Sequence, residues 1–205
     1  PSLFQLLNKF TKLRREKKKI LQTTQEKSWL ESIDKQLIEI GEKIISNKRN
    51  FLNEFQEFLK HENNQFFQFE IQPSYGLEHQ EDFLIKFKQD LSDENQWPKD
   101  HKLQSEHDPQ KSIFEITHEG KKLSQLSSAQ SKLLILSFLL HCAKFLSQQK
   151  ITIFLIDEIF DNFDMINIEK VIQYCAENKF QTFFSTTDNF ALQGVINNLE
   201  IKEIT

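Results

Sequence analysis

The chain has 205 residues and a formal net charge of −4 at pH 7, so it has room for one large or two small domains and carries no overall basic surface for nucleic acid. Its two cysteines and six histidines show no metal-ligand spacing, which argues against a zinc site and against a disulfide framework. We therefore expect Cys142 and Cys175 to be reduced thiols in a cytoplasmic protein, and we recognise no signal peptide or membrane span.

Two long amphipathic helices are expected at the start of the chain. Apolar residues recur at mostly helical spacing from residue 3 to residue 20 and again from residue 33 to residue 58. A polar break separates the two stretches, and Ser28 followed by Glu31 predicts a capping box at the start of the second helix. These patterns predict an antiparallel helical arm, and we assign residues 1–92 to an arm region that also contains a short strand and a helix.

A basic run late in the first helix is a candidate contact surface for DNA. Its members are Arg14, Arg15, Lys17, Lys18 and Lys19. A solvated helical face is the more common explanation of such a run. The functional alternative is contact with DNA phosphates, which would need no base recognition and would weaken as salt rises. Both interpretations remain open from the sequence.

The second part of the chain, residues 93–205, is expected to alternate strands with helices. A turn at Glu119 and Gly120 predicts a short hairpin after a polar, proline-containing loop. We expect strands at residues 66–71, 112–117, 151–156 and 180–184, and helices at residues 81–91, after Ser127 and at residues 167–177. A strand–helix–strand order of this length favours a parallel sheet with right-handed crossovers.

The strand at residues 151–156 carries the most informative signal of the chain. Its sequence, ITIFLI, predicts a fully buried parallel strand, and Asp157 and Glu158 follow it directly. Carboxylates at the carboxyl end of such a strand lie where open α/β sheets bind their ligands. Nucleotide hydrolases hold Mg²⁺ and polarise a water molecule with two acids in this arrangement, the Walker B motif. A core strand that ends in a solvated acidic turn is the alternative.

The helix before this strand begins with the sequence LSSAQ at residues 126–130. ABC-type ATPases carry Leu-Ser-x-Gly-Gln at this place, and Ser127 is a good N-cap for a helix end that faces a phosphate. An ordinary serine-capped core helix is the alternative. The helix is not expected to span a membrane, because its mostly apolar run is only about eleven residues long and is followed by Lys144.

A phosphate-binding loop of the form GxxxxGK[ST] is absent from these 205 residues. Gly120 is followed by two lysines, but it has neither the upstream glycine nor the following serine or threonine. We therefore expect the sequence to be the C-terminal part of a longer protein.

Four segments, in the same order along the chain, resemble the RecF family of bacterial DNA repair ATPases, relatives of the SMC and ABC-type enzymes. Residues 34–52 resemble the family's arm helix, which runs Asp-x-Gln-Leu, Gly, Ile, then Arg and an aromatic residue. Residues 127–130 stand where the family has Ser-x-Gly-Gln, with Ala129 in place of the glycine. Residues 155–164 (LIDEIFDNFD) resemble its Leu-Leu-Asp-Asp-Val-Phe-Ser-Glu-Leu-Asp, and residues 181–188 (QTFFSTTD) its closing Gln-Val-Phe-Ile-Thr-Thr-Thr-Asp.

The resemblance implies an α/β fold: the C-terminal half of an ABC-type (P-loop NTPase) ATPase head, with an α-helical arm before it. It implies an ATP-dependent DNA-binding protein of recombinational repair, replication restart and the SOS response. ATP and Mg²⁺ would be its cofactors, and single-stranded/double-stranded DNA junctions, RecR and RecO its partners. ATP would hold two copies together as a homodimer, with no membrane involved.

The resemblance also assigns roles to single residues. Asp157 would hold Mg²⁺ through water, and Glu158 would polarise the attacking water as the catalytic residue. Asp164 would order the dimer seam as the D-loop residue, and Thr186 would act as the switch residue. Ser127, Ala129 and Gln130 would bind ATP held by the other subunit, although the Ala129 methyl group lies where the backbone should approach a phosphate.

Two other functions fit parts of the sequence. A second SMC-like ATPase, of the RecN or phage-defence type, usually carries a histidine after the last strand, where this chain has Thr186, Thr187 and Asp188. A non-catalytic interaction remnant of a split gene is favoured by Ala129 and by the missing phosphate loop. The intact Asp157–Glu158 pair argues against it.

Overall fold

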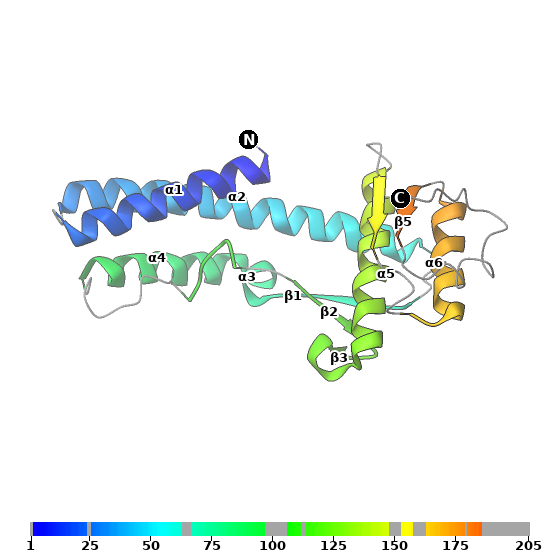
Figure 1. Ribbon diagram of the computed structural model, residues 1–205. Helices are drawn as coiled ribbons and strands as arrows, with labels where there is room; N and C mark the ends of the chain where they lie inside the picture. The colour runs from blue at the N-terminus through cyan, green and yellow to red at the C-terminus, as the bar shows by residue number, and fades with distance from the viewer. Residues whose placement is uncertain are drawn as a thin grey trace. The chain divides into compact units, whose positions relative to one another are not determined.

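The computed structural model describes residues 2–23, 26–62, 67–96, 106–111, 114–147, 153–157, 163–178 and 180–185. In these residues the protein is mostly helical, with short strands between the helices (Figure 1). It divides into two compact units: unit 1 comprises Pro1–Gln56 and Ile71–Glu115, and unit 2 comprises Glu57–Glu70 and Ile116–Thr205. The boundary expected between residues 92 and 93 falls within helix α4 (Gln80–Gln96), inside unit 1.

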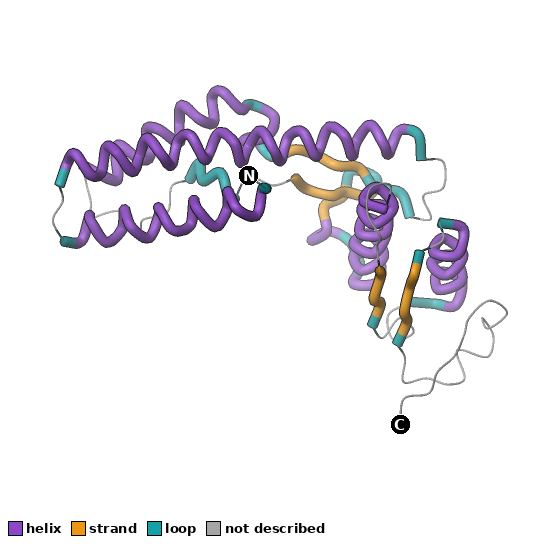
Figure 2. The backbone as a smooth tube through the Cα atoms, turned by 90° about the horizontal axis from the view of Figure 1, so that it is seen from above, coloured by secondary structure: helices purple, strands orange, loops and turns teal. Residues whose placement is uncertain are grey.

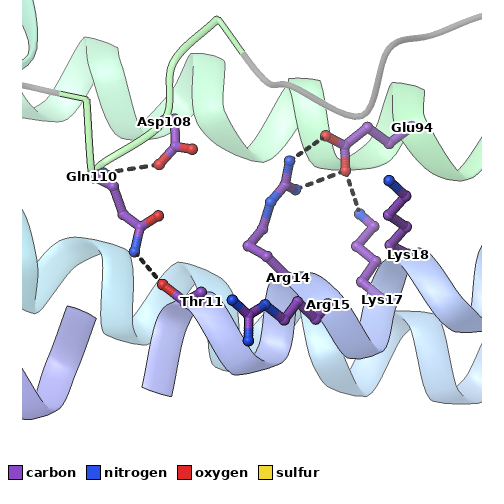
Figure 3. Close-up of a pocket in the computed structure, with 8 residues that line it drawn as sticks. All are labelled: Thr11, Arg14, Arg15, Lys17, Lys18, Glu94, Asp108 and Gln110. Atoms are coloured by element: carbon purple, nitrogen blue, oxygen red, sulfur yellow. Dashed lines mark hydrogen bonds and ion pairs between the residues drawn. The ribbon is translucent and has the colours of Figure 1, made fainter. Parts of the chain in front are cut away.

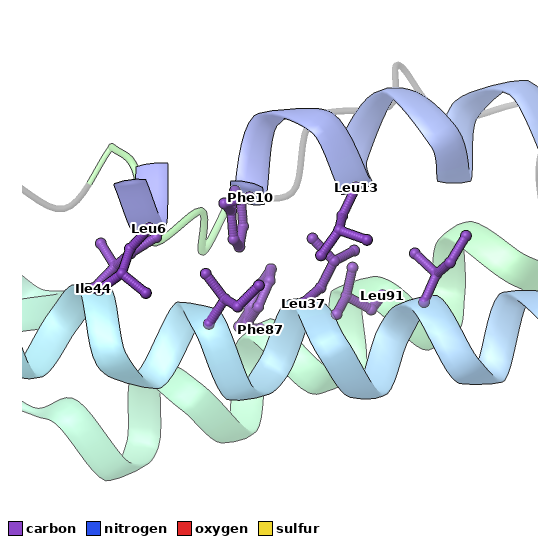
Figure 4. Close-up of a cluster of buried hydrophobic side chains, with 9 residues drawn as sticks. Leu6, Phe10, Leu13, Leu37, Ile44, Phe87 and Leu91 are labelled. Atoms are coloured by element: carbon purple, nitrogen blue, oxygen red, sulfur yellow. The ribbon is translucent and has the colours of Figure 1, made fainter. Parts of the chain in front are cut away.

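Unit 1 is built on three helices: α1 (Leu3–Gln22), α4 and most of α2 (Lys27–Lys60). The first two helices of the predicted arm are confirmed, and α4 adds a third that packs against both. Figure 4 shows their shared apolar core, to which α1 contributes Leu6, Phe10 and Leu13, α2 contributes Leu37 and Ile44, and α4 contributes Phe87 and Leu91.

The capping box predicted at Ser28 and Glu31 is wrong. Helix α2 already begins at Lys27, so Ser28 lies inside its first turn and its hydroxyl donates to the Glu26 carboxylate at 3.1 Å. A capping box is found instead at the start of α1, where the Ser2 hydroxyl accepts from Gln5 N at 3.3 Å and the Gln5 side chain accepts from Ser2 N at 3.0 Å. The sequence reasoning did not identify this cap.

Gly41 allows a close approach inside unit 1. A Cβ atom at this position would lie 2.9 Å from Pro109 Cγ and 3.1 Å from the Phe87 ring, both closer than ordinary van der Waals contact. The packing of α2 against α4 and against the turn that holds Pro109 therefore requires a residue without a side chain. Nearby, the Lys48 ammonium donates to the carbonyl oxygens of Pro109 and Gln110, both at 2.9 Å.

Short strands and turns lie between α2 and α4 and after α4 in the sequence. Strand β1 (Glu70–Pro73) precedes the single-turn helix α3 (Tyr75–Glu78), and strand β2 (Phe114–His118) turns back antiparallel into β3 (Lys121–Lys122), with Thr117 opposite Lys122. The three strands are ordered β1-β2-β3 in one sheet. The predicted hairpin turn is confirmed, because Glu119 and Gly120 both have positive φ, at 51° and 72°.

Unit 2 contains a parallel strand pair whose inner face is covered by two helices. Helix α5 (Ser128–Ser147) is followed by β4 (Ile153–Ile156), α6 (Met165–Glu177) and β5 (Gln181–Phe184). The strands lie side by side in Figures 1 and 2, paired from Ile153–Gln181 to Ile156–Phe184, so the predicted parallel pairing is confirmed. The core between them joins Leu136 and Leu140 of α5, Ile168, Val171 and Ile172 of α6, and Phe154, Ile156 and Phe184 of the strands.

The outer face of the strand pair is exposed, so the prediction of a fully buried strand is wrong for β4. The side chain of Leu155 is 75% exposed, and those of Ile153 and Phe183 are 55% and 54% exposed. Alternate residues of β4 and β5 point to opposite faces, and α5 and α6 cover only one of them.

Helix α5 is long and apolar enough to cross a membrane by length and composition alone. In unit 2 it acts as a core helix, because residues from more than one of its faces are buried. These buried residues are Leu133, Leu134, Leu136, Ser137, Leu140, His141 and Ala143.

Candidate functional site

Asp157 lies at the carboxyl end of β4, beside the end of β5. The Ser185 hydroxyl donates a hydrogen bond to Asp157 Oδ1, and Ser185 N donates to the Ile156 carbonyl oxygen at 3.0 Å. The side chains of both residues are exposed. The carboxyl edge of a parallel pair is where open α/β sheets bind ligands, so Asp157 presents a carboxylate at the expected place. Glu158 and Thr186, the predicted catalytic and switch residues, lie outside the described residues.

Ser127 caps helix α5, as the sequence predicts. Its hydroxyl accepts from Gln130 N at 3.2 Å, while the Gln130 side chain accepts from Ser127 N at 3.1 Å. The two predicted signature residues therefore bond each other in a reciprocal capping box. In the part of the chain that the structure describes, the N–H groups of Ser128 and Ala129 have no hydrogen-bond partner, which leaves two donors at an exposed, electropositive helix end.

Ala129 does not strain the start of this helix. It lies in the first turn of α5 with its side chain exposed, and Glu119 is the one described non-glycine residue with positive φ. The backbone conformation at Ala129 is therefore open to any residue, so its methyl group affects only the space in front of the helix.

Asp164 is the N-cap of α6. Its Oδ1 accepts from Asn167 N at 2.9 Å, and its Oδ2 accepts from the Asn167 side-chain amide at 3.0 Å. Both carboxylate oxygens thus hold the first turn of α6. Asp164, the predicted D-loop residue, therefore serves as a helix cap within the single chain.

The basic run of α1 separates into buried and exposed residues. The Arg14 guanidinium makes two hydrogen bonds with the Glu94 carboxylate, both at 2.8 Å. Lys17 is only 1% exposed, and its ammonium lies 2.7 Å from Asp34 Oδ1, 2.8 Å from the Leu91 carbonyl oxygen and 3.3 Å from Glu94 Oε2. Figure 3 shows Arg14 and Lys17 directed at Glu94. These two cations therefore join α1 to α2 and α4.

The other three members of the run are exposed, and their side chains form no ion pair or hydrogen bond within the described residues: Arg15, Lys18 and Lys19. Arg15 and Lys18 line a cavity of about 220 Å³ on the side of α1 that faces Gln110 (Figure 3). Gln110 donates to the Thr11 hydroxyl at 2.7 Å at one end of this cavity. Sequence reasoning found the cations but missed Asp34 and Glu94 as their partners, since nothing in the local pattern links residues so far apart in the chain.

A buried polar cluster in unit 2 was also missed. His141 is fully buried, and its Nδ1 donates to the Ser137 carbonyl oxygen at 2.7 Å, so the proton sits on Nδ1. Burial lowers the pKa of His141, which favours the neutral ring. Beside it, Lys144 forms an ion pair with Glu62 at 2.6 Å. The only signal in the sequence was a histidine within an apolar helix.

The cysteines offer no reactive group. Both are free thiols, Cys175 buried and Cys142 half-buried. Burial raises the pKa of Cys142 to about 12 and also raises the pKa of Cys175, so both stay protonated near neutral pH. No cluster of three or more metal-ligating side chains occurs among the residues that the structure describes.

No known protein family matches the sequence, and no curated protein matches it. Its architecture is similar to that of a recombination mediator protein of known structure, with a TM-score of 0.63 and 20% sequence identity. That structure is described as "the recombination mediator protein RecF-ATPrS in RecFOR pathway". The similarity covers 91% of this chain and 54% of the solved one, so the chain spans about half the length of that structure. The expected RecF-like fold is thereby confirmed.

Proposed function

We propose that this chain is the signature-motif and Walker B half of a RecF-like ATPase head, preceded by its helical arm. One observation carries the proposal: in a RecF-like fold, Asp157 stands at the carboxyl end of a parallel strand pair and accepts a hydrogen bond from Ser185, the residue directly after the neighbouring strand. An acidic turn with a purely structural role could lie anywhere on the surface. A Mg²⁺–nucleotide site in an open α/β sheet lies at the carboxyl end of its parallel strands, where Asp157 is found.

The residues present fit one side of an ATP–Mg²⁺ site. Protein-bound Mg²⁺ typically takes one or two carboxylates and completes its shell with phosphates and water, so the single exposed carboxylate of Asp157 suffices. Glu158 follows it directly in the sequence and would polarise the attacking water, and Mg²⁺ would neutralise negative charge on the phosphates when bound. The exposed start of α5, with Ser127, Ala129 and Gln130, would bind the γ-phosphate of ATP held by a second copy.

The phosphate loop, in this proposal, belongs to a polypeptide lobe outside these 205 residues. The sequence has no GxxxxGK[ST], and the outer face of β4 and β5 leaves Ile153, Leu155 and Phe183 more than half exposed. Three large apolar side chains on one face of a strand pair are typical of a surface that another element covers. A lobe with the phosphate loop on this face would complete both the core and the site.

The biological setting follows from the same likeness. The similar structure is a recombination mediator of the RecFOR pathway. We propose that this chain serves in DNA repair and recombination in the cytoplasm, on DNA junctions, with RecO and RecR as partners and with an ATP-dependent homodimer as the active form. Asp164 then orders the seam between the two copies, and Thr186 acts as the switch residue.

The test is to fuse a RecF-type phosphate-loop lobe ahead of Pro1 and to measure ATP hydrolysis. The isolated chain should show no turnover above background, whereas the fusion should hydrolyse ATP slowly. In the fusion, Glu158→Gln should reduce turnover by roughly two to four orders of magnitude, as expected for loss of a general base, with ATP binding retained.

Glu169→Gln is the matched control, because Glu169 is an exposed acid on α6 with no proposed role. It should leave turnover unchanged. Robust hydrolysis by the isolated chain, or a Glu158→Gln fusion as active as the control, would refute the assignment of this half-site.

A further inference from the structure

The outward side of α1 carries a stripe of exposed cations. Lys12, Arg15 and Lys19 are exposed at a spacing of three and four residues, which places them in one row along the helix. Lys18 flanks the row on the side of the cavity described above. The side chains of these four residues form no ion pair or hydrogen bond with another described residue. We call this set the α1 stripe.

The stripe is locally basic in a chain whose net charge is −4. Glu16 is the single acid in the sequence of α1, and Arg14 and Lys17 are already engaged with carboxylates of α2 and α4. Within the described residues, therefore, no ion pair neutralises the side chains of the stripe. Four exposed cations with so little opposing charge form a surface complementary to a polyanion.

The cavity beside the stripe gives this surface a defined binding point. Four cations (Arg14, Arg15, Lys17 and Lys18) and two anions (Glu94 and Asp108) line it. Because the buried pairs use Arg14 and Lys17, the guanidinium of Arg15 and the ammonium of Lys18 are the donors left for a ligand. A guanidinium and an ammonium that line one small cavity suit a phosphate group.

Resting on the DNA-binding role proposed above, we propose that the α1 stripe is a nucleotide-independent docking surface for a duplex DNA backbone. Arg15 and Lys18 take one phosphate at the cavity, and Lys12 and Lys19 contact neighbouring phosphates. Lys12 and Lys19 are separated by about 10 Å along the helix, a length that covers about three phosphates of one strand of B-DNA. The contacts involve only the backbone, so they carry no sequence preference.

An anionic membrane is the less suitable partner. Membrane-surface helices insert an apolar face beside their basic residues. The apolar face of α1, with Leu6, Phe10 and Leu13, is buried against α2 and α4 and is not available for insertion. A rigid polyanion contacted by charge alone fits the stripe better.

The experiment measures binding of the chain, without ATP, to a fluorescent 30-base-pair duplex of mixed sequence by anisotropy between 50 and 200 mM salt. The stripe variant carries Lys12→Gln, Arg15→Gln and Lys19→Gln. Lys18 still holds the phosphate that it shares with Arg15, so two phosphate contacts are lost and the slope of log K against log salt should flatten by about 1.8. Over this fourfold salt range the affinity of the wild type should therefore fall about 12-fold more than that of the variant.

The control variant carries Lys35→Gln, Lys43→Gln and Lys88→Gln, which are exposed lysines on α2 and α4. It has the same net charge as the stripe variant and should retain the wild-type slope. Glutamine favours helices about as well as lysine, so both variants should keep their helical circular dichroism.

Equal slopes for the two variants, or no binding by the wild type at 50 mM salt, would overturn the inference. Binding to phosphatidylserine vesicles that depends on the stripe and exceeds binding to the duplex would assign the surface to membranes and also overturn it. ATP hydrolysis by the fusion is measured separately. An active fusion combined with equal slopes would thus refute the docking surface alone.

Discussion

Replacing Lys17 with methionine tests the charged interior of unit 1 most directly. The side chain of Lys17 is 1% exposed, and its ammonium contacts Asp34, Glu94 and the Leu91 carbonyl oxygen. Lys17→Met keeps much of the side-chain volume but leaves two carboxylates and a carbonyl oxygen without that donor. Removing one partner of a buried ion pair commonly costs about 3–5 kcal/mol.

The structure places the expected cost at the lower end of this range. Glu94 keeps its two hydrogen bonds with Arg14, and Asp34 keeps a 2.6 Å hydrogen bond from the Asn95 amide. The Asp34 side chain is also 14% exposed, which lets water solvate it in part. We therefore expect Lys17→Met to lower the free energy of unfolding by about 3 kcal/mol.

The assay is urea unfolding, with hydrogen exchange of the α1, α2 and α4 amides to locate the effect in unit 1. Arg15→Met is the matched control, because Arg15 is a neighbouring exposed cation, and it should change stability by no more than about 0.5 kcal/mol. In an Asp34→Asn background the cost of Lys17→Met should shrink, since the stranded charge is gone. If Lys17→Met proves as stable as Arg15→Met, the ion pairs do not hold unit 1 together.

Three further predictions concern single side chains. Gly41→Ala should destabilise the protein by about 1 kcal/mol in urea unfolding, because overpacking against Pro109 at 2.9 Å outweighs the gain in helix propensity, and an unchanged midpoint would contradict this contact. Asp164→Ala should cost about 1 kcal/mol and speed hydrogen exchange in the first turn of α6, while Asp164→Asn should retain most of the stability; equal effects of the two would refute the cap. Burial holds the pKa of His141 below its usual 6.5, so the stability that the neutral ring contributes is complete above pH 6.5 and is lost as the pH falls below that value. His141→Gln should remove this part of the pH dependence of the unfolding free energy, measured from pH 8 to pH 5. An unaltered pH profile would mean that His141 does not cause it.

The sequence predicted the features that depend on local pattern. Helices α1, α2, α4, α5 and α6 and the β4–β5 pairing follow from residue spacing, and the cap at Ser127 follows from its neighbours. Ser28 was misassigned because a serine followed three residues later by glutamate also occurs one turn inside a helix. Local signals of this kind place an element well and its first residue poorly.

Ion pairs between residues far apart in the chain could not be predicted from the sequence. Arg14 and Lys17 appeared in one uniform basic run, and only their burial against Glu94 and Asp34 separates them from Arg15 and Lys18. The exposure of Leu155 could not be predicted from the sequence either. An apolar strand sequence shows that both faces of the strand are suited to burial, but it does not show whether another element covers each face.

The ion pairs of unit 1 also bear on how its helices are aligned. Contacts between leucine and phenylalanine side chains do not require one exact partner. In a bundle held by such contacts alone, one helix can therefore slide by one turn, about 5.4 Å, and still bury its apolar stripe. Such a slide would carry Lys17 away from Asp34 and Glu94 and leave all three charges buried apart, so the charged set penalises every alignment but one. We expect spin labels on α1 and α4 to give one narrow distance in the wild type and a broader distribution in Lys17→Met/Asp34→Leu/Glu94→Met. An equally narrow distribution would mean that the apolar core alone selects the alignment.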